Sequence, residues 1–332
     1  MKDIALKLNL SISTVGRALG DDPRISKETK DIVRQTADEL GYVANRAAQV
    51  MRGNQSHLIG LLVPDIQSTF YAMVAQNLSA CFEGKGYHLA LSITDDNPEK
   101  ELAKVQELVS TRVAGIAIIP TASPKQKTLE LFKQIPHVQI LRYIPALGDW
   151  FGMDDERGIQ DAVKHLVRLG HRRIAFVGDV VFPTGKVRYN AFCKSLKEAG
   201  IKVEKSFVQL GFPDREYGHE AILNLMSQPV KPTAIIATAV QLTLGVAEQL
   251  TALNIKVPDN VSVIGYGDAD WCPWWGPGLT TLKLPVENFS TNCGLWFVNS
   301  LEKKRHILNK TPHLSMSSIA LLERGSTAIP PS

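Results

Sequence analysis

Residues 10–19 read LSISTVGRAL and bring three hydroxyl side chains and one arginine into a short segment framed by aliphatic residues. Hydroxyl groups and the free N–H groups at the start of a helix can bind phosphate oxygens. An arginine fork can donate to two acceptors at once, as the O6 and N7 atoms of guanine allow. This chemistry suits contact with a nucleic acid, although one helix face of this composition is also typical of solvent-exposed surface.

A small helical unit is expected to position these side chains. Apolar residues recur at helical spacing through residues 1–43 and predict three short helices. Ser11 and Ser26 stand where N-caps are expected, and Asn9 occupies the turn between the first two helices, where a left-handed backbone is needed. A helix, a tight turn and a second helix make a helix-turn-helix motif. The second helix then presents Ile12, Ser13, Gly16 and Arg17 on its outer face.

Other arrangements that could support chemistry are weak. The segment GDVVFPTGKV at 178–187 resembles a phosphate loop, but its spacing is two residues too long and no Ser or Thr follows Lys186. Neither G-x-S-x-G nor H-E-x-x-H occurs, and adjacent acids such as Asp154 and Asp155 are expected to point apart. The four cysteines are isolated from one another and from histidines at metal-ligand spacing. We therefore expect no catalytic residues, no metal site and no cofactor.

Length and composition limit the class of protein without naming a function. A chain of 332 residues that is 44% hydrophobic can bury two or more cores. The formal net charge is only +4, which on its own does not indicate a nucleic-acid partner. The N-terminus carries no apolar signal segment, and no apolar run approaches the ~18 residues of a membrane span. We expect a cytoplasmic protein with reduced thiols and no membrane partner.

From residue 58 the pattern changes to short aliphatic strands separated by helix-length segments. Eight such strands, beginning with LIGLLVPD and ending with NVSVIGYGD, precede the segment LTTLKLP. Apolar strands that alternate with amphipathic helices predict a parallel sheet covered on both faces. Because eight strands exceed what one open sheet of this length usually holds, we expect two doubly wound lobes, with a ligand cleft at the carboxyl ends of the strands.

The whole chain resembles the lactose/galactose-repressor family of transcription regulators. The N-terminal segment from KDIALKLN to LVPD carries the resemblance, and blocks in the family's order follow: GYHLALSITDDNPEKE, RVAGIAIIP, DDERGIQDAVKHLVRLGHRRIAFVGD, VPDNVSVIGYGD and LTTLKLP. The resemblance implies a helix-turn-helix DNA-binding headpiece over 1–43, a hinge helix and linker over 44–56, and a core of periplasmic-binding-protein type over 57–332. The two core lobes would comprise about 57–151 with 284–312, and about 152–283 with 313–325. It also implies a homodimer that binds a pseudo-palindromic DNA operator.

The resemblance assigns DNA contacts residue by residue. Positions that read bases are matched by Ile12, Ser13 and Arg17, and positions that contact phosphates by Thr14, Ser26, Thr29, Tyr42 and Asn45. Ala48 and Met51 match the hinge-helix pair that enters the minor groove, where an apolar wedge opens a base step. Two residues depart from the family pattern: methionine replaces the usual leucine at Met51, and glycine replaces the usual serine at Gly16.

The resemblance also places an effector site in the cleft. The matching positions are Phe70, Tyr71, Asp154, Arg188, Phe212 and Asp268, and Arg142 stands at a strand end facing the same cleft. The aromatic residues among them could equally belong to the lobe cores. The tryptophans in DWCPWWGPG either floor the pocket or face a partner subunit. Arginine at position 188 suits a ligand with carboxylates or hydroxyls, because its fork donates two parallel hydrogen bonds.

The effector class is where this chain departs from its sugar-responsive relatives. Those relatives usually carry Asn-Asp where this chain has Ala239 and Val240, and Asp where it has Gly267. A buried polyol without such partners would leave hydroxyls unpaired, at ~1–3 kcal/mol each. We therefore expect a small anionic, aromatic or otherwise apolar metabolite held by Arg188 rather than a neutral sugar. The alternative function is a cytoplasmic solute-binding module without a role in gene regulation, for which residues 1–52 would have no use.

Overall fold

A computed structural model describes residues 1–42, 56–303 and 311–331 of the chain. The residues divide into two compact units, Met1–Ser56 and His57–Ser332, and each is described here by itself. We call the first unit the headpiece and the second the core. The predicted hinge residues Asn45, Ala48 and Met51 lie outside the described residues.

The described part of the headpiece, residues 1–42, contains three short helices around a small apolar cluster. They are α1 (Lys2–Leu8), α2 (Ile12–Leu19) and α3 (Lys27–Glu39). Asn9 closes α1 with a left-handed backbone at φ 51° and ψ 41°, as the turn between the first two helices requires. Val15 and Ala18 of α2 and Val33 of α3 are fully buried where the helices meet. The three predicted helices and the turn between the first two are confirmed.

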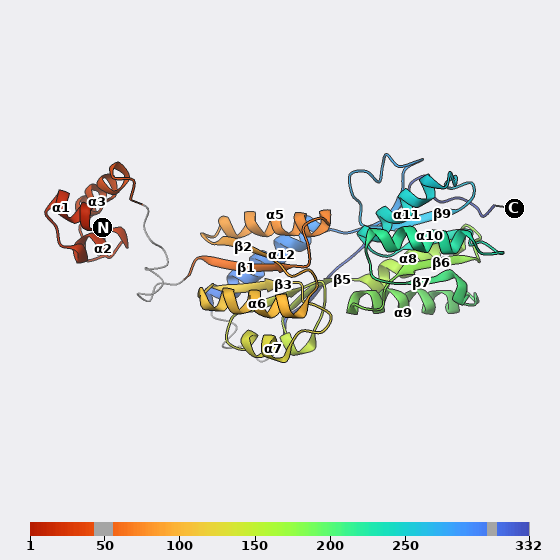
Figure 1. The fold of residues 1–332 in the computed structure, drawn as a ribbon, viewed down its shortest axis with the longest axis horizontal. Coiled ribbons are helices and arrows are strands. Elements are labelled where there is room, and N and C mark those ends of the chain that lie inside the picture. The colour runs from red at the N-terminus through yellow and green to blue at the C-terminus, as the bar shows by residue number, and fades with distance from the viewer. Residues whose placement is uncertain (43–55, 304–310, 332) are drawn as a thin grey trace. The chain divides into compact units, whose positions relative to one another are not determined.

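The first lobe of the core is a six-stranded parallel sheet in the order β2-β1-β3-β4-β5-β11. Helices α5 and α12 pack together, as do α6 and α7 (Figure 1). The strands are β1 (Leu58–Val63), β2 (His88–Ile93), β3 (Gly115–Ile118), β4 (His137–Ile140), β5 (Trp150–Met153) and β11 (Leu314–Ser317). The helices are α5 (Thr69–Glu83), α6 (Pro98–Ser110), α7 (Gln126–Phe132) and α12 (Val286–Glu302), with a short 3₁₀ turn η1 (Pro145–Leu147).

The second lobe repeats this plan with the order β7-β6-β8-β9-β10-β12. Only β12 runs antiparallel to its neighbour, β10, among the described strands. The strands are β6 (Ile174–Gly178), β7 (Val208–Leu210), β8 (Ala234–Ala237), β9 (Ser262–Tyr266), β10 (Thr280–Lys283) and β12 (Ala320–Leu322). The helices are α8 (Asp155–Arg168), α9 (Pro183–Glu198), α10 (Arg215–Met226) and α11 (Val240–Ala252), with a 3₁₀ turn η2 (Lys205–Phe207). Two doubly wound lobes are thus confirmed, with one antiparallel edge strand added.

Three connections join the lobes. The chain passes from β5 to α8 at Asp154, from β10 to α12 at residues 284–285, and from β11 to β12 at residues 318–319. The first and third connections lie side by side, because Asp154 N donates to Ser317 O at 2.9 Å. The expected lobe boundaries therefore shift: β5 and β11 both belong to the first sheet, although residues 152–153 and 313–317 were expected in the second lobe.

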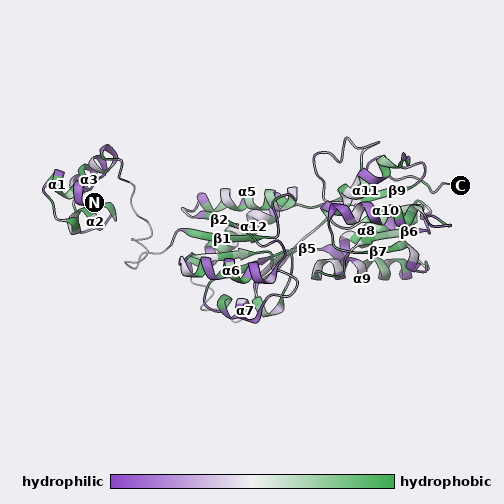
Figure 2. Cartoon of the chain, viewed as in Figure 1, coloured by the Kyte–Doolittle hydropathy of each residue, from purple (hydrophilic) through white to green (hydrophobic). Residues whose placement is uncertain are grey.

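The patterning of the core follows the strands that the sequence predicts. All nine predicted strands are present, and β1, β3, β6, β8 and β9 carry the buried apolar runs expected of a sheet covered on both faces. The edge strands β2 and β7 are partly exposed. Figure 2 shows apolar strands between helices of mixed hydropathy. The sequence prediction missed β5, β11 and β12, which are three or four residues long; β11 and β12 are also edge strands.

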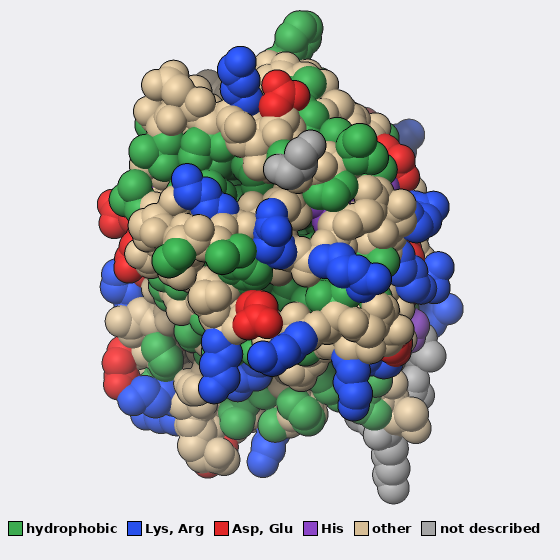
Figure 3. Space-filling model, turned by 90° about the vertical axis from the view of Figure 1, so that its right-hand side faces the viewer, with side chains coloured by type: hydrophobic (Ala, Val, Ile, Leu, Met, Phe, Trp, Pro, Cys, Tyr) green, Lys and Arg blue, Asp and Glu red, His purple; other side chains and the backbone are tan. Residues whose placement is uncertain are grey.

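The surface of the second lobe shows mixed charge. Figure 3 shows Lys and Arg side chains interspersed with Asp, Glu and hydrophobic side chains on the end of the core that this lobe forms. Such a distribution agrees with the small formal net charge of +4 over the whole chain.

Candidate functional site

The exposed face of α2 carries the side chains expected to read DNA bases. Ser11 caps the helix by accepting a hydrogen bond from Thr14 N at 3.0 Å. Ile12, Ser13 and Arg17 are exposed, Ile12 to 47%, while Val15 and Ala18 fix the opposite face in the headpiece core. An α-helix fits the major groove of B-form DNA, and an exposed arginine there can reach guanine.

The residues expected to contact phosphates gather at helix starts and near the end of the headpiece. Ser26 caps α3 by accepting from Thr29 N at 3.2 Å, and the hydroxyls of Ser26 and Thr29 lie 2.8 Å apart. Thr14 stands in the first turn of α2, and Tyr42 packs against the headpiece core with its ring half-buried. Hydroxyls and free N–H groups at two helix starts suit phosphate oxygens.

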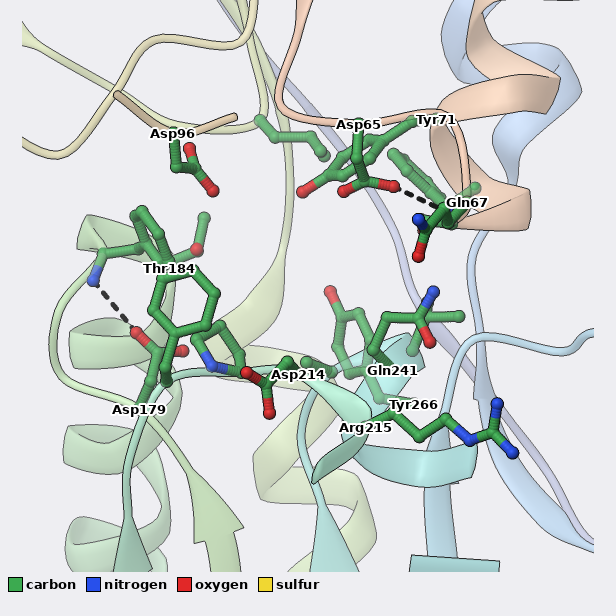
Figure 4. Close-up of a pocket in the computed structure, with 18 of the residues that line it drawn as sticks. Asp65, Gln67, Tyr71, Asp96, Asp179, Thr184, Asp214, Arg215, Gln241 and Tyr266 are labelled. Carbon is green, nitrogen blue, oxygen red and sulfur yellow. Dashed lines mark hydrogen bonds between the residues drawn. The ribbon is translucent and has the colours of Figure 1, made fainter. Parts of the chain in front are cut away.

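A cavity of about 740 Å³ lies between the two lobes of the core, within the size range of small-molecule sites (Figure 4). Its lining comes from residues that follow strands β1, β2, β4, β6, β7 and β8, and from the starts of helices α5 and α10. The carboxyl ends of both parallel sheets therefore face it, which is where open α/β sheets bind ligands. Five of the seven expected effector residues line it: Phe70, Tyr71, Arg142, Arg188 and Phe212.

Arg188 of α9 is held inside the second lobe by three partners. Its Nε and Nη2 atoms donate to the Asp155 carboxylate at 2.8 and 3.3 Å, and Nη1 donates to Thr238 O at 2.8 Å. Nη2 also donates to the Tyr266 hydroxyl, whose ring lies 4.0 Å below the guanidinium carbon. Burial opposes the charge, but the Asp155 carboxylate outweighs it and holds the pKa of Arg188 above its ordinary value. The positive charge of Arg188 is therefore already balanced.

Arg142, which follows β4, is paired in a different way. Its guanidinium group binds the Asp96 carboxylate of the same lobe and donates to Pro120 O at 3.1 Å. The guanidinium carbon also lies 3.7 Å from the centre of the Phe182 ring, which belongs to the second lobe. Burial would lower the pKa of Arg142, yet its charged neighbours raise it above its ordinary value. Arg142 thus contacts both lobes at the cavity.

The cavity wall is rich in rings and has one apolar side. Phe70 and Tyr71 start α5, and Phe182 meets Phe212 edge to face with ring centres 5.9 Å apart. Ala239 and Val240 line the cavity where sugar-responsive relatives carry Asn-Asp, and Leu244 and Leu284 extend this apolar side. A ligand with a flat or apolar part would bury it here. Phe70 is also part of the first lobe's core, so both readings of the aromatic residues hold for it.

Two expected effector residues have other roles. Asp154 caps α8 by accepting from Arg157 N at 3.1 Å. Asp268 pairs with Arg324 at 2.8 Å and accepts from the Thr281 hydroxyl. Neither lines the cavity in the part of the chain that the structure describes.

The tryptophan loop after β9 does not form the floor of the cavity. Trp271 and Trp275 pack against the second lobe's core, and Trp275 Nε1 donates to the Thr251 hydroxyl at 3.0 Å. Trp274 is 86% exposed. The other alternative, that this loop faces a partner subunit, stays a prediction.

Several cavity residues were missed from the sequence, and a common signal could have found some of them. Asp65, Asp96 and Asp179 each follow closely behind a buried strand, so the carboxyl edge of a parallel sheet places them at the cleft. Tyr266 also lines the cavity and ends β9, so the same signal applies to it, whereas Asp155 is buried outside the lining as a partner of Arg188.

Within residues 1–42, 56–303 and 311–331, the structure brings together no group of three or more His, Cys, Asp or Glu that could hold a metal ion. Over the same residues, no helix has the length and apolar character needed to cross a membrane. All four cysteines are free thiols.

Comparisons with known proteins agree with this arrangement. The family described as bacterial regulatory proteins, lacI family, matches residues 1–45, and a periplasmic binding protein-like domain matches residues 163–327. The transcriptional regulator DegA of Bacillus subtilis is 30% identical over 292 residues, covering 86% of each chain. The transcriptional repressor PurR of Pasteurella multocida is 28% identical, covering 95% of this chain and 96% of its own.

Solved structures share the fold over almost the whole chain. The lac repressor dimer bound to operator and the anti-inducer ONPF superposes with a TM-score of 0.85 at 22% identity, covering 98% of both chains. The regulator CelR in complex with cellobiose gives a TM-score of 0.73 at 20% identity, again over 98% of both.

The helix-turn-helix headpiece and the two-lobed core with a cavity define a ligand-binding transcription regulator. The chain belongs to the lacI family of bacterial transcriptional regulators, and its curated relatives are regulators rather than enzymes.

Proposed function

We propose that this regulator binds a pseudo-palindromic operator as a homodimer and that a small metabolite in the interlobe cavity controls its affinity for DNA. The observation that carries the proposal is the cavity between two lobes that share three connections, in a chain that also has a DNA-binding headpiece. A ligand that contacts both lobes changes their relative position only if it binds one arrangement better than another. The hinge residues 44–56 would carry that change to the headpiece.

The headpiece would read DNA through Ile12, Ser13 and Arg17. Thr14, Ser26, Thr29, Tyr42 and Asn45 would hold the phosphates, and Ala48 with Met51 would enter the minor groove. A hinge segment of this length is too short to be a stable helix alone, so DNA would stabilise it. The wall residues Phe70, Tyr71, Arg142, Arg188 and Phe212 would shape the effector site.

Arg17 tests the DNA side of the proposal. Operator sequences are first selected from random DNA with the wild-type protein, and a two-fold pattern is expected among them. Arg17→Ala should then lose ~1–3 kcal/mol on the selected operator and relax specificity at one base pair per half-site. Tyr42→Phe should instead weaken binding to all sequences about equally, since a phosphate contact carries no sequence information.

Arg34→Ala is the matched control, because Arg34 is an exposed arginine that belongs to α3 rather than to α2 and pairs with Asp21. It should leave the selected base preference unchanged. An Arg17→Ala protein with the wild-type preference would contradict the role of α2. Failure of the wild-type protein to select any DNA would instead favour a solute-binding module without a regulatory role.

A further inference from the structure

The cavity wall carries carboxylates without an ion-pair partner, whereas each of its arginines has one. Each arginine on its wall is paired with an acid: Arg142 with Asp96, Arg188 with Asp155, and Arg215 with Glu248. Four wall acids have no ion-pair partner among the described residues, namely Asp65, Asp179, Asp214 and Glu216. Figure 4 shows such acids on both sides of the opening, with Asp65 on one side and Asp179 and Asp214 on the other. The wall therefore attracts positive charge.

This balance removes the premise for an anionic effector held by Arg188. Four of the five N–H donors of that side chain already bind Asp155, Thr238 O and Tyr266. An anion entering the cavity would approach three paired arginines and four carboxylates without an ion-pair partner, with no unpaired cation on the described wall. Like charges in a partly desolvated site repel strongly.

Asp179 is the deepest of the free acids. It follows β6, is only 2% exposed, and accepts a hydrogen bond from Phe182 N at 2.9 Å. Position 185 is glycine, and a Cβ there would collide with the Asp179 carboxyl group, so the backbone of α9 makes room for this acid. Burial raises the pKa of Asp179 above its ordinary value, although the N–H of Phe182 and the charges of Arg188 and Arg142 act in the opposite direction. A ligand cation in hydrogen-bonding contact would add a partner for this buried carboxyl group.

Aromatic rings stand close to this acid. Phe182, three residues along the chain, packs edge to face against the half-exposed Phe212, and both rings line the cavity with Tyr71 of the other lobe. The face of an aromatic ring attracts a cation, and the attraction grows when water is excluded. Carboxylates and ring faces together are the surroundings that favour an organic ammonium group over a carboxylate or an uncharged hydroxyl.

We propose that the effector of this regulator is an organic cation whose amine is bound by Asp179 beside the rings of Phe212 and Tyr71. The Phe182 ring already lies against the Arg142 guanidinium and supports Phe212 from behind. The proposal rests on the proposed function, since it takes the interlobe cavity as the effector site. Asp65, Asp214 and Glu216 draw the cation toward the opening, and the apolar side formed by Ala239 and Val240 covers the rest of the molecule. The amine is the group that distinguishes this effector.

Binding of two matched sets of probes tests this class. One set is glucosamine, glucose and glucuronate, and the other is 2-phenylethylamine, 2-phenylethanol and phenylacetate. Isothermal titration of the full-length protein should show that the amine of at least one set binds about tenfold or more tightly than its neutral and acidic counterparts. Asp179→Asn, which keeps the shape and the acceptor for Phe182 N, should reduce this preference to less than about threefold.

Asp259→Asn is the matched control, because Asp259 is an exposed acid in the turn before β9, at the opposite end of the sheet from the cavity. It should keep the wild-type preference. If Asp179→Asn does not fold, Asp214→Asn at the rim should still weaken the amine several-fold, because it keeps the cap on Tyr217 N and removes one charge. No binding by either amine, equal or tighter binding of the neutral or acidic member, or an amine preference that survives Asp179→Asn each overturns the proposal.

DNA binding measured on the same samples separates this proposal from the proposed function. If a neutral or acidic probe binds and alters affinity for the selected operator, the cavity is still an effector site and only the ligand class is wrong. If the wild-type protein binds no operator at all, the regulatory function itself fails.

Discussion

The two lobes carry similar arginines at the cavity but connect them differently. Arg188 donates hydrogen bonds to Asp155, Thr238 and Tyr266, which all lie within its own lobe. Arg142 pairs with Asp96 of its own lobe and lays its guanidinium over Phe182 of the other. The difference indicates that one arginine stabilises a lobe and the other couples two lobes. Both are buried arginines on the cavity wall, and their partners separate the two roles.

Removing the carboxylate partner of Arg188 should have the largest effect. Asp155→Ala leaves a guanidinium buried without its counter-charge, and breaking such a pair costs ~3–5 kcal/mol. Urea unfolding of the core, with ΔG in water as the readout, should show this loss. Asp155→Leu combined with Arg188→Met should recover most of it, because a well-packed apolar pair can replace a buried ion pair.

Glu248→Ala is the control for that experiment. Glu248 pairs with Arg215 at 2.5 Å, but the Arg215 side chain is 56% exposed and that of Glu248 33%, so the pair is solvated and contributes less to stability than a buried one. Equal losses from Asp155→Ala and Glu248→Ala would contradict the stabilising role assigned to the Arg188 cluster.

Shortening the ring beneath Arg142 should have a smaller effect, and on a different observable. Phe182→Leu removes a contact between the lobes worth ~0.5–2 kcal/mol and should shift the core toward a more open arrangement. The radius of gyration from small-angle X-ray scattering should rise. Phe212→Leu, which removes a cavity ring that stacks on no arginine in the described chain, is the control and should leave the radius of gyration near its wild-type value. An unchanged radius in Phe182→Leu would show that Arg142 does not couple the lobes.

The smallest expected effects concern pH, and the lobes should respond in opposite directions. Burial raises the pKa of Glu101 in α6 of the first lobe and lowers the pKa of His171 in the second. Folding therefore favours the neutral acid and the neutral imidazole. The contribution of Glu101 is full below about pH 4.5 and is lost as pH rises through its raised pKa. The contribution of His171 is present above about pH 6.5 and is lost as pH falls toward its lowered pKa.

Glutamine at each position tests this difference. Glu101→Gln should be more stable than wild type by about 1 kcal/mol at pH 8 and lose that advantage near pH 4.5. His171→Gln should instead flatten the loss of stability between pH 7 and pH 5. Unfolding curves across this range provide the measurement, and parallel pH profiles for wild type and both variants would contradict the assignment of these two groups.

The sequence predicted most of the strands and helices, because buried parallel strands leave long apolar runs and capped helices leave hydroxyls at their starts. It missed β5, β11 and β12; β11 and β12 are edge strands that are partly exposed and therefore lack a buried apolar run. It also could not assign the return of β11 to the first lobe, because that pairing joins residues 314–317 with 150–153, far apart in the chain.

The cavity was predicted in position but not in charge. Asp154 and Asp155 are neighbours, yet Asp154 caps α8 and Asp155 turns inward to Arg188. A shift of the helix start by one residue would exchange these positions, and the sequence does not fix the start that accurately. Arg188 and Arg142 suggested cations available to a ligand, because the sequence alone does not reveal which acid pairs with each arginine. Ion pairs between distant segments, such as Arg142 with Asp96, exist only after folding brings strand ends together.

The three connections between the lobes also have a mechanical consequence. Two rigid bodies in general move relative to each other with six degrees of freedom. The short connections at Asp154 and at residues 318–319 lie together, and the one at residues 284–285 is the second point of attachment. These connections oppose sliding and separation of the lobes more than rotation about the line through the two points of attachment. The relative motion of the lobes is then described mainly by one angle. The size of whatever occupies the cavity sets that angle, so molecules of different shape but similar girth would be read as the same signal.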